Sequence, residues 1–410
     1  MKILIYLVLA VLLCWITACK RISEDLDNDP ARGFTFHDPL ESANWQNDSL
    51  VSDFERNLAY ISLQKEYTEK QRLVDSLLAA LKINGIPCIE QEILAHFIYQ
   101  DSANGRVEIT GDFNNWSENG TAMSRLEGTN LYFYSARFPA SARIEYKLRT
   151  NGIRMNDPLN PNSSCYGDFS RNSELRMPFY MSPPEIEYYE IPHGLIKVLQ
   201  YYDTNRRIQV YLPPGYIENA GVYPCAYFHD GNSFLQIGMA KNILDYLIYH
   251  KKIKPVIAVF VDPVNRDNEY YYGYEYMETF VNRIVPYVEK NFRVDHESKN
   301  RSILGYSLGG LSALLFARHH PDVFGNCAAF SPAIFTGDII QSYRESPYLS
   351  TRFYIDAGTY ENWIYTPSRE LATLMAHKKF VGRFYSWHEY HSICSWRAHL
   401  DEALCFFYGA

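Results

Sequence analysis

The chain has 410 residues, of which 39 are Lys or Arg and 47 are Asp or Glu, so its formal net charge at pH 7 is −8. This mildly acidic balance, without a basic patch interleaved with aromatic residues, argues against nucleic acid as a partner. The length suffices for two folded domains, of about 95 and about 225 residues, that each bury a core.

The N-terminus is typical of an export signal. Met1-Lys2 supplies a short positive start, and Ile3 to Ala18 form an apolar stretch shorter than a membrane-spanning helix requires. The stretch ends in Ile16-Thr17-Ala18-Cys19, and small residues before a cysteine resemble a bacterial lipoprotein signal. The resemblance implies a signal peptide over residues 1–18, cleaved before Cys19, which then carries the lipid anchor.

This signal also predicts where the protein lies. A lipid-anchored protein lies in the cell envelope with the membrane as a partner, and Lys20 in place of an aspartate favours the outer membrane of a two-membrane bacterium. The acidic run from Ser23 to Asp29 is compatible with surface export and with a solvated periplasmic tether. A secretory peptide with an incidental cysteine is the alternative interpretation.

Residues 19–83 are expected to form a tether and a helical spacer. The segment from Leu50 to Ile83 is charged and carries apolar residues at helical spacing, and Pro87 ends the pattern. These apolar positions include Leu58, Ile61, Leu73, Leu77 and Leu81. One or two helices are therefore predicted, which act as a spacer or pack on the next module. A partner-binding helix is the alternative.

Residues 84–180 contain short apolar runs joined by polar turns, a pattern that predicts β-strands. Arg106 to Trp116 alternates apolar and polar residues and ends in a Gly-Asp-Phe-Asn-Asn-Trp turn. Three further runs continue the pattern: Leu131–Tyr134, Arg143–Leu148 and Asp157–Pro161. The segment resembles the early-set immunoglobulin-like module related to glycogen-binding domains, which implies an all-β sandwich.

Trp116 has two interpretations. It is either part of a surface that contacts carbohydrate or substrate, or a packing residue that fills the core of its own module. The packing role is favoured, because nothing in the sequence marks a ring of exposed aromatic side chains.

The second domain is expected to begin near residue 185, and an early strand is predicted from Val222 to Phe228. A glycine-containing turn follows, His229-Asp230-Gly231-Asn232, which can present a backbone amide inward. In hydrolases with a nucleophile on a later strand, such an amide stabilises the oxyanion. Asn232 is the expected donor, and Gly231 and Ser233 remain alternatives, since a backbone donor has no side-chain signature.

The segment Arg301 to Gly310 places Ser307 on a sharp turn between a buried strand and a helix. Gly305 and Gly309 give the spacing Gly-x-Ser-x-Gly, in which small neighbours permit a strained backbone close to the following helix. Strain exposes the hydroxyl, and the amide-rich end of the helix points at it. Ser307 is therefore the predicted nucleophile, and the amide of Leu308 the first oxyanion donor.

A carboxylate should follow the nucleophile in chain order. The β-rich run from Thr351 to Ala357 contains Asp356, and the loop after Gly358 contains Glu361. Open α/β sheets carry their chemistry beyond the strand ends. Glu361 is therefore preferred over Asp356, which lies inside the strand pattern.

A histidine should come last. A β-rich run from Phe380 to Trp387 is followed by His388 and His391, before a helix expected from about Ser395 to Phe407. The general base must reach both the serine hydroxyl and the acid, which favours a loop position. His391 is therefore preferred over His388.

Residues from about 185 to 410 resemble the esterase family that includes enterochelin esterases, esterase D and the feruloyl and acetyl-xylan esterases. The matching pieces are Tyr211-Leu-Pro-Pro-Gly-Tyr216, His229-Asp-Gly231, Val261-Asp-Pro263 with Arg266 and Glu269-Tyr270, the elbow with Gly309-Gly310-Leu311-Ser312-Ala313-Leu314, and His391 before Trp396-Arg397. The resemblance implies an α/β hydrolase with a mostly parallel sheet flanked by helices, preceded by the immunoglobulin-like early-set domain.

The same resemblance implies a triad of Ser307, Glu361 and His391 and marks His229, Arg266, Glu269 and Trp396 as candidate substrate contacts. Many relatives carry Gly-Gly before the histidine, whereas this chain has Glu389-Tyr390, so a narrower pocket is expected. The tyrosine-rich run from Tyr270 to Tyr276 either lines a substrate cleft or starts a surface helix.

Cysteines and histidines show no metal-ligand spacing, so neither metal nor cofactor is expected. Besides Cys14 and Cys19, six cysteines remain: Cys88, Cys165, Cys225, Cys327, Cys394 and Cys405. Their spacings fit no disulfide framework, and several lie in apolar runs, so mostly buried thiols are expected.

The expected function is a serine esterase that acts outside the cytoplasm. Its expected substrates are phenolic or acetyl esters of polysaccharide, and the ester linkages of a catecholate siderophore are the alternative. A non-catalytic glycan-binding lipoprotein with a decayed hydrolase domain is a hypothesis of a different class. The complete, ordered triad argues against decay.

Overall fold

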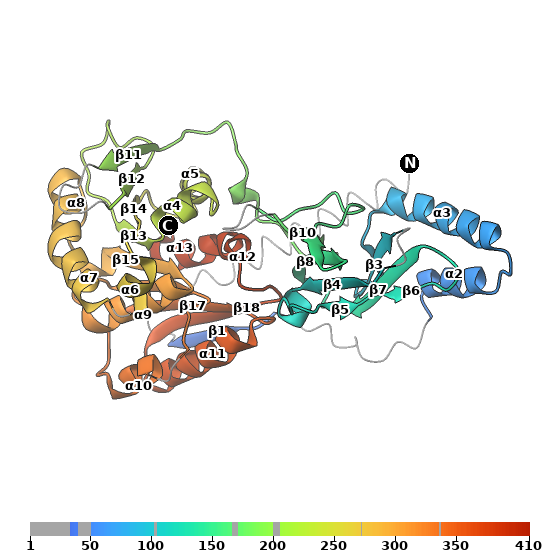
Figure 1. The fold of residues 1–410 in the computed structure, drawn as a ribbon. Helices are drawn as coiled ribbons and strands as arrows, with labels where there is room; N and C mark the ends of the chain where they lie inside the picture. Colours follow the sequence, from blue (N-terminus) through green and yellow to red (C-terminus); the bar gives the residue numbers. More distant parts are fainter. Residues whose placement is uncertain are drawn as a thin grey trace.

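The structure is a computed structural model that describes residues 33–39, 51–101, 105–165, 171–199, 206–271, 273–335 and 338–410. An α/β domain lies at one end of an elongated molecule, an all-β front module lies beside it, and two helices lie beyond the module (Figure 1). The predicted signal peptide and Cys19 lie outside the described residues. None of the helices in the described ranges is long and apolar enough to cross a bilayer.

The α/β domain is built on a nine-stranded sheet with the order β1-β18-β17-β16-β15-β13-β14-β12-β11. All neighbours from β1 to β14 are parallel, whereas β12 is antiparallel to both β14 and β11. The strands are β1 Phe34–His37, β11 Leu195–Leu199, β12 Ile208–Leu212, β13 Cys225–His229, β14 Ile257–Val261, β15 Arg301–Tyr306, β16 Asn326–Phe330, β17 Arg352–Gly358 and β18 Val381–Trp387.

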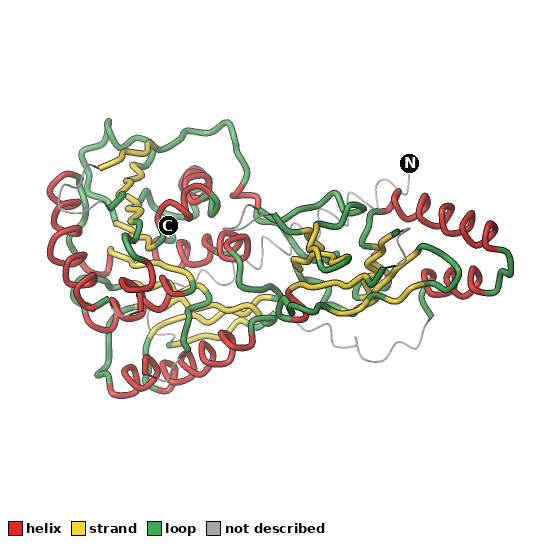
Figure 2. Tube along the Cα trace, in the orientation of Figure 1, coloured by secondary structure: helices red, strands yellow, loops and turns green. Residues whose placement is uncertain are grey.

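Both faces of this sheet are covered by helices (Figure 2). Strand β13 shows why, because all five of its residues are buried and successive side chains point to opposite faces. Cys225 and Tyr227 join the core on one face, and Ala226 and Phe228 join the core on the other. The helices are α4 Gly231–Gln236, α5 Ala240–Tyr249, α6 Arg266–Tyr271, α7 Tyr274–Thr279, α8 Val285–Asn291, α9 Leu308–His319, α10 Asp338–Glu345, α11 Asn362–His377, α12 Ile393–Ala398 and α13 Leu400–Tyr408.

Strand β1 belongs to this sheet although its residues fall in the predicted tether. It pairs in parallel with β18, from Phe34 opposite Gly382 to His37 opposite Tyr385. Asp38 fixes the end of the strand, because it accepts hydrogen bonds from Arg369 and Ser386. The partner strand lies more than 300 residues away in the sequence, so no local pattern indicates the pairing.

The front module consists of two antiparallel sheets that share one core. Side chains of β3 and of β4 and β8 meet in it, among them Phe97, Ile109 and Tyr146. The first sheet contains β2 Cys88–Glu90, β3 Leu94–Gln100, β6 Ser124–Arg125 and β7 Leu131–Arg137. The second contains β4 Val107–Gly111, β5 Thr121–Ala122, β8 Arg143–Thr150, β9 Ile153–Met155 and β10 Ser173–Arg176.

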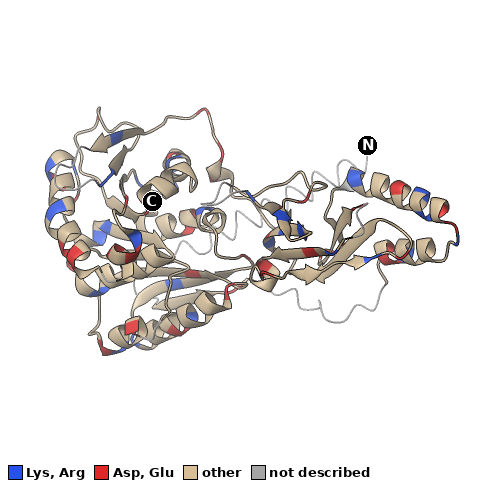
Figure 3. Cartoon of the chain, viewed as in Figure 1, with Lys and Arg blue, Asp and Glu red and all other residues tan. Residues whose placement is uncertain are grey.

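The predicted spacer forms two helices, α2 Asp53–Ser62 and α3 Tyr67–Asn84. Their apolar residues, including Phe54 and Val74, pack on Ile98 and Leu131 of the front module. Basic and acidic positions are interspersed along both helices (Figure 3), and neighbouring turns form ion pairs such as Arg72 with Glu69. The spacer therefore packs on the module, one of the two roles expected for it.

Candidate active site

The nucleophile turn lies between the carboxyl end of β15 and the start of α9. Ser307 has φ 53° and ψ −123°, a left-handed backbone conformation that a non-glycine residue rarely adopts. Gly305 permits this turn, because a Cβ atom there would lie 2.2 Å from the carbonyl oxygen of Gly309. The strained turn predicted from the Gly-x-Ser-x-Gly spacing is present.

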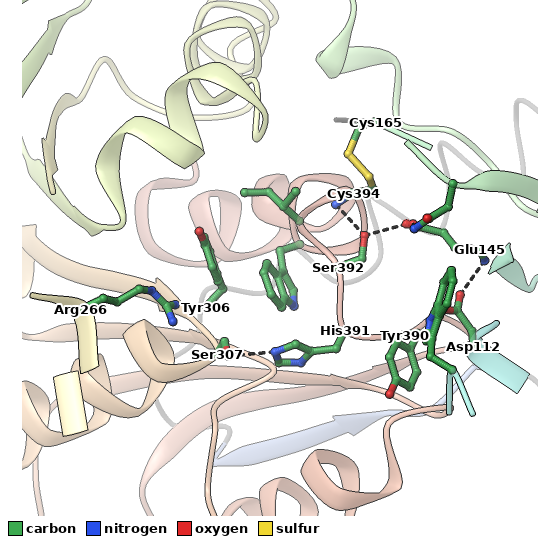
Figure 4. A pocket seen from close by; sticks show the side chains of 14 residues that line it. Asp112, Glu145, Cys165, Arg266, Tyr306, Ser307, Tyr390, His391, Ser392 and Cys394 are labelled. Atoms are coloured by element: carbon green, nitrogen blue, oxygen red, sulfur yellow. Dashed lines mark hydrogen bonds between the residues drawn. A yellow bond between two sulfur atoms is a disulfide. The ribbon is translucent and has the colours of Figure 1, made fainter. Parts of the chain in front are cut away.

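Three side chains form a hydrogen-bonded series at the carboxyl ends of the parallel strands. The Oγ of Ser307 lies 2.8 Å from Nε2 of His391 (Figure 4). Nδ1 of His391 lies 2.6 Å from Oε2 of Glu361. An ionised carboxylate can only accept, so Nδ1 carries the hydrogen and Nε2 is free to accept from the serine. The structure thus brings together the serine, histidine and glutamate that the sequence singles out.

Glu361 is held from two further directions. Its Oε1 accepts hydrogen bonds from the amide of Gly358 at 2.6 Å and from the hydroxyl of Ser331. Ser331 in turn accepts from the indole nitrogen of Trp396 at 2.9 Å. The Glu361 side chain is fully buried, so its position is fixed by these donors rather than by solvent.

The competing acid and histidine lie elsewhere. Asp356 accepts the amide of Ser331 at 2.9 Å, and burial raises its pKa to about 7. The Nδ1 of His388 lies 3.1 Å from the hydroxyl of Thr359. Asp356 and His388 therefore bond to Ser331 and Thr359, surroundings expected of residues at or inside strand ends.

The expected second oxyanion donor is wrong. The amide of Asn232 donates to a carboxylate oxygen of Asp262 at 2.7 Å, so it points away from Ser307. The direction of a backbone amide depends on the turn, and here the αL conformation of Asp230 (φ 50°) sets how α4 leaves the strand. Leu308 is the first residue of α9, where helix amides have no helical acceptor, and its role as an oxyanion donor stays a prediction.

Ser307 and His391 open onto a cavity of about 480 Å³. Its walls come from both parts of the molecule (Figure 4). The α/β domain contributes Arg266, Tyr306, Ser307, Tyr390, His391, Ser392, Ile393, Cys394 and Trp396. The front module side contributes Asp112, Trp116, Glu145, Cys165 and Asn172.

Two of the four candidate substrate contacts line this cavity. Arg266 forms a bidentate ion pair with Asp230 at 2.9 and 2.8 Å. Burial would lower the pKa of Arg266, but the hydrogen bonds and charge of Asp230 raise it, so the guanidinium stays charged. Trp396 stacks on Tyr306 with ring centroids 4.2 Å apart and meets the ring of His391 edge-on.

The other two candidates, His229 and Glu269, do not line the cavity. His229 is fully buried beside the hydroxyl of Tyr276, and burial, with the charges of Arg206 and Arg266, lowers its pKa to about 3. Glu269 accepts both terminal nitrogens of Arg206 at 2.7 and 2.9 Å. Both side chains make structural contacts within the α/β domain. Their position in a shared motif gives no sign of which way they face.

Two side chains of the tyrosine-rich run point inward. Tyr270 and Tyr276 are buried in the core beneath the site, and the hydroxyl of Tyr270 accepts the amide of Asp230 at 2.9 Å. These two side chains neither line the cavity nor lie on the surface, whereas Tyr274 is exposed and begins α7, as the interpretation of a surface helix start expects.

The front module contributes more than packing. Trp116 is half-buried and lines the cavity, and its indole nitrogen donates to Asp112 at 2.8 Å. Burial raises the pKa of Asp112 well above its usual range, helped by the charge of Glu145. The preferred packing role of Trp116 is therefore wrong, because the turn that carries it faces the α/β domain.

The two residues before His391, Glu389 and Tyr390, have different surroundings. Tyr390 lines the cavity, in agreement with a narrowed approach. Glu389 is buried instead, with Oε1 2.9 Å from Nε2 of His399. Of the two positions, only Tyr390 lines the cavity, and the narrower pocket stays a prediction.

A disulfide joins the two parts next to the cavity. Cys165 is bonded to Cys394 at the start of α12, across a separation of 229 residues. The sequence predicts mostly buried thiols, and Cys225 and Cys327 are free and buried. For Cys165 and Cys394 this prediction is wrong, because sequence spacing carries no information on which loops meet.

Ser331 is a site residue that sequence reasoning missed. It follows β16 directly, as Ser307 follows β15, and the carboxyl ends of neighbouring parallel strands lie together. A polar residue one position beyond a buried strand was therefore the available signal.

Comparisons with known proteins agree on one family. The family model described as "Putative esterase" matches residues 200–407. The endo-1,4-beta-xylanase/feruloyl esterase of Xylanibacter ruminicola is 25% identical over 240 residues, which cover 53% of this chain and 32% of that protein. Uncharacterized protein YbbA of Bacillus subtilis is 29% identical over 143 residues, 31% of this chain and 56% of that protein. This chain therefore matches only part of the length of these relatives.

Solved structures show the same fold. The enterobactin esterase FES of Shigella flexneri, crystallised in the presence of enterobactin, aligns with a TM-score of 0.65 and 19% identity, over 78% of this chain and 94% of that chain. The ferric enterobactin esterase of Salmonella typhimurium aligns with a TM-score of 0.64, also at 19% identity, over 77% and 93%. The likeness confirms the α/β hydrolase fold with its mixed sheet. The immunoglobulin-like character of the front module stays a prediction.

Proposed function

This chain belongs to the Putative esterase family, and from that premise we propose that it is a serine carboxylic-ester hydrolase. One observation carries the proposal: the series from Ser307 through His391 to Glu361, with distances of 2.8 and 2.6 Å, opens onto a cavity. A nucleophile, a base and an orienting acid within hydrogen-bond reach are the requirements of this chemistry. The intact series favours catalysis over the hypothesis of a decayed hydrolase.

In the proposed reaction the Oγ of Ser307 attacks the ester carbonyl carbon while Nε2 of His391 takes its proton. The carbonyl oxygen becomes an oxyanion, which the amide of Leu308 stabilises. His391 then protonates the leaving alcohol, and an acyl-enzyme remains on Ser307. Water, deprotonated by His391, releases the acid and restores the serine. Glu361 stabilises the imidazolium in both halves.

For the substrate we propose phenolic or acetyl esters of polysaccharide. The cavity supports this choice, because aromatic side chains from both parts of the molecule line it: Trp116, Tyr306, Tyr390 and Trp396. Aromatic rings offer flat apolar surfaces for sugar or phenol rings. The relative described as a xylanase/feruloyl esterase, similar over 53% of this chain, supports the same class.

The test compares wild type with Ser307→Ala. Hydrolysis of nitrophenyl acetate, methyl ferulate, acetylated xylan and ferric enterobactin should identify the preferred ester. The variant should lose about four to six orders of magnitude in kcat, as expected when one member of an interdependent triad is removed. A fluorophosphonate should label the wild type only. Labelling that persists in Ser307→Ala would show that another serine is the nucleophile.

For the front module we propose an early-set, immunoglobulin-like sandwich that contacts polymeric substrate through Trp116. Its two antiparallel sheets with a shared core support the fold, and the place of Trp116 in the cavity wall supports the contact. Trp116→Ala should weaken turnover of polysaccharide more than turnover of nitrophenyl acetate. An equal loss on both would contradict the contact.

For the location we propose a lipid anchor at Cys19, in the cell envelope and at the outer membrane. The sequence Ile16-Thr17-Ala18-Cys19 motivates this proposal. Cys19→Ser should abolish labelling with radioactive palmitate and remove the protein from the membrane fraction. Palmitate incorporation at the wild-type level would overturn the proposal.

A further inference from the structure

The loop that carries His391 is held by the front module as well as by its own domain. This loop runs from the end of β18 at Trp387 to the start of α12 at Ile393. Within the α/β domain it is fixed near its beginning, where the carbonyl of Glu389 accepts the amide of Tyr360 at 3.3 Å. On the C-terminal side of His391, the carbonyl of Ser392 accepts the amides of Ser395 and Trp396 at 3.0 and 3.1 Å within the same domain, and the hydroxyl of Ser392 reaches β8 of the front module.

Strand β8 reaches the loop at two points. The amide of Arg143 donates to the carbonyl of His388 at 3.0 Å. The hydroxyl of Ser392 donates to Oε1 of Glu145 at 2.8 Å. Arg143 and Glu145 are two positions apart, so their side chains lie on one face of the strand. Arg143 and Glu145 of β8 therefore form hydrogen bonds with the loop on both sides of His391.

Glu145 is itself rigid. Its Oε1 accepts Nη2 of Arg143 at 2.7 Å, and its Oε2 accepts the side-chain amide of Asn172 at 2.7 Å. Arg143 is also bonded to Glu174 at 2.8 Å, and its side chain is 3% exposed. Burial would raise the pKa of Glu145, but the charge of Arg143 and these hydrogen bonds lower it, so the acceptor remains ionised.

Ser392 connects Glu145 to the backbone next to His391. Its Oγ accepts the amide of Cys394 at 3.1 Å and so caps α12, while its hydrogen points at Glu145. A serine hydroxyl has one hydrogen, so the bond to Glu145 sets which lone pair faces the helix. Ser392 directly follows His391, and its orientation limits the backbone freedom of that histidine.

We propose that Arg143 and Glu145 of the front module are positioning residues for His391. They hold its loop at His388 and Ser392 so that the imidazole stays in line between Glu361 and Ser307. The front module is then part of the catalytic apparatus even for an ester too small to touch it. This inference rests on the proposed function, because positioning is measured through the reaction.

The test uses nitrophenyl acetate with two variants, Glu145→Ala and Ser392→Ala. Each should lower kcat by about 10- to 100-fold and leave KM within about twofold, because a misplaced base slows the reaction and does not alter the binding of a small ester. The double variant should lose little more than either single variant, since both remove the same bond. A strictly multiplicative double loss would overturn the assignment.

Two further variants separate positioning from general damage. Glu145→Gln keeps an oxygen acceptor for Ser392 and should retain kcat within about threefold of wild type. Glu108→Ala is the matched control, because Glu108 is also a buried strand carboxylate paired with arginine, at 2.8 Å from Arg149, and its arginine partners Arg106 and Arg149 belong to the front module. Its kcat should equal that of wild type. A kcat loss in Glu108→Ala equal to that in Glu145→Ala would show a nonspecific effect.

The failure of this proposal can be told apart from the failure of the proposed function. Folded Glu145→Ala and Ser392→Ala proteins with wild-type kcat, beside an inactive Ser307→Ala, would overturn positioning alone. If Glu145→Ala does not fold, Ser392→Ala and its conservative counterpart Ser392→Thr carry the test. If the wild type hydrolyses no ester, the low-field NMR signal of the proton between His391 and Glu361 becomes the readout. It should broaden in Ser392→Ala, and an unchanged signal would overturn the proposal.

Discussion

Ser331 decides which of two neighbouring acids serves the histidine. Its hydroxyl donates to Glu361, while its amide donates to Asp356 at 2.9 Å. Glu361 keeps its second oxygen 2.6 Å from His391, whereas Asp356 is enclosed by Ser331 and the hydroxyl of Tyr354. One residue therefore assigns the two carboxylates to different surroundings.

We expect the four single variants at these positions to divide into two pairs. His391→Ala should lose about as much kcat as Ser307→Ala, and Glu361→Gln somewhat less, because a correctly placed imidazole and the oxyanion donor still contribute. His388→Ala and Asp356→Asn should keep turnover within about tenfold of wild type. Steady-state kinetics on nitrophenyl acetate measure this, and an inactive Asp356→Asn beside an active Glu361→Gln would reverse the assignment.

Asp356 should also make stability depend on pH. Burial raises its folded pKa to about 7, against about 3.9 in an unfolded chain, so between these values the folded state binds more protons. Its contribution to the free energy of unfolding therefore falls as pH rises from about 4 to about 7. Asp356→Asn removes this dependence and should gain stability relative to wild type over that range, by up to about 4 kcal/mol.

Urea unfolding at several pH values between 4.5 and 8 measures this difference. The exposed Asp267 is the matched control, and Asp267→Asn should keep a constant offset from wild type. A constant offset for Asp356→Asn as well would show that this carboxyl has an ordinary pKa in the folded protein.

At the scale of elements, the turn between β15 and α9 works because backbone passes close to backbone. A Cβ atom at Gly305 would meet the carbonyl oxygen and carbon of Gly309 at 2.2 and 2.4 Å. Backbone atoms cannot rotate away as a flexible side chain can. The glycine is therefore required by the packing of the helix start on the strand end.

Gly305→Ala should accordingly lower stability by about 3 kcal/mol or more and abolish fluorophosphonate labelling of Ser307, since such an overlap displaces the turn itself. Thermal unfolding with labelling of the soluble fraction measures both effects. Gly221→Ala is the control, because no atom lies within 4 Å of its added Cβ. A stable, labelled Gly305→Ala protein would contradict the steric argument.

At the scale of the whole molecule, the cavity exists because two parts of the chain meet. Trp116 and Asp112 face His391 across a space that α12 also borders. The Cys165–Cys394 disulfide joins the parts at this border, and the buried Arg143 network lies beside it. The wall furthest from the nucleophile thus depends on contacts between the modules.

Removing this disulfide should loosen the junction. Cys165→Ser with Cys394→Ser should lower the free energy of unfolding by about 2–4 kcal/mol, because the cross-link restricts the unfolded chain over 229 residues. Wild type in reductant should match the double variant when melting temperatures are compared. Cys88→Ser leaves the bridge intact, since Cys88 is a free thiol, and should still respond to reductant as wild type does. A wild type insensitive to reductant would contradict the role of the bridge.

Features of this protein that depend on short-range pattern can be predicted from its amino-acid sequence. The glycines around Ser307 predict a turn because their spacing is local. Buried parallel strands are predicted from continuous apolar runs. The order of serine, acid and histidine then placed Glu361 and His391 at strand ends, where parallel sheets gather their side chains. The apolar spacing of the spacer segment likewise predicts its two helices, because helical periodicity is a local pattern.

Features that depend on the direction of a side chain or amide, or on distant partners, are set by the packing of the folded chain. The amide of Asn232 turns to Asp262, and His229 points into the core, because neighbouring strands and helices fix the turn that carries them. Trp116 faces the cavity because the front module lies against α12. Contacts between segments hundreds of residues apart, such as β1 with β18, arise from the packing of the whole chain, and no local run of residues encodes them.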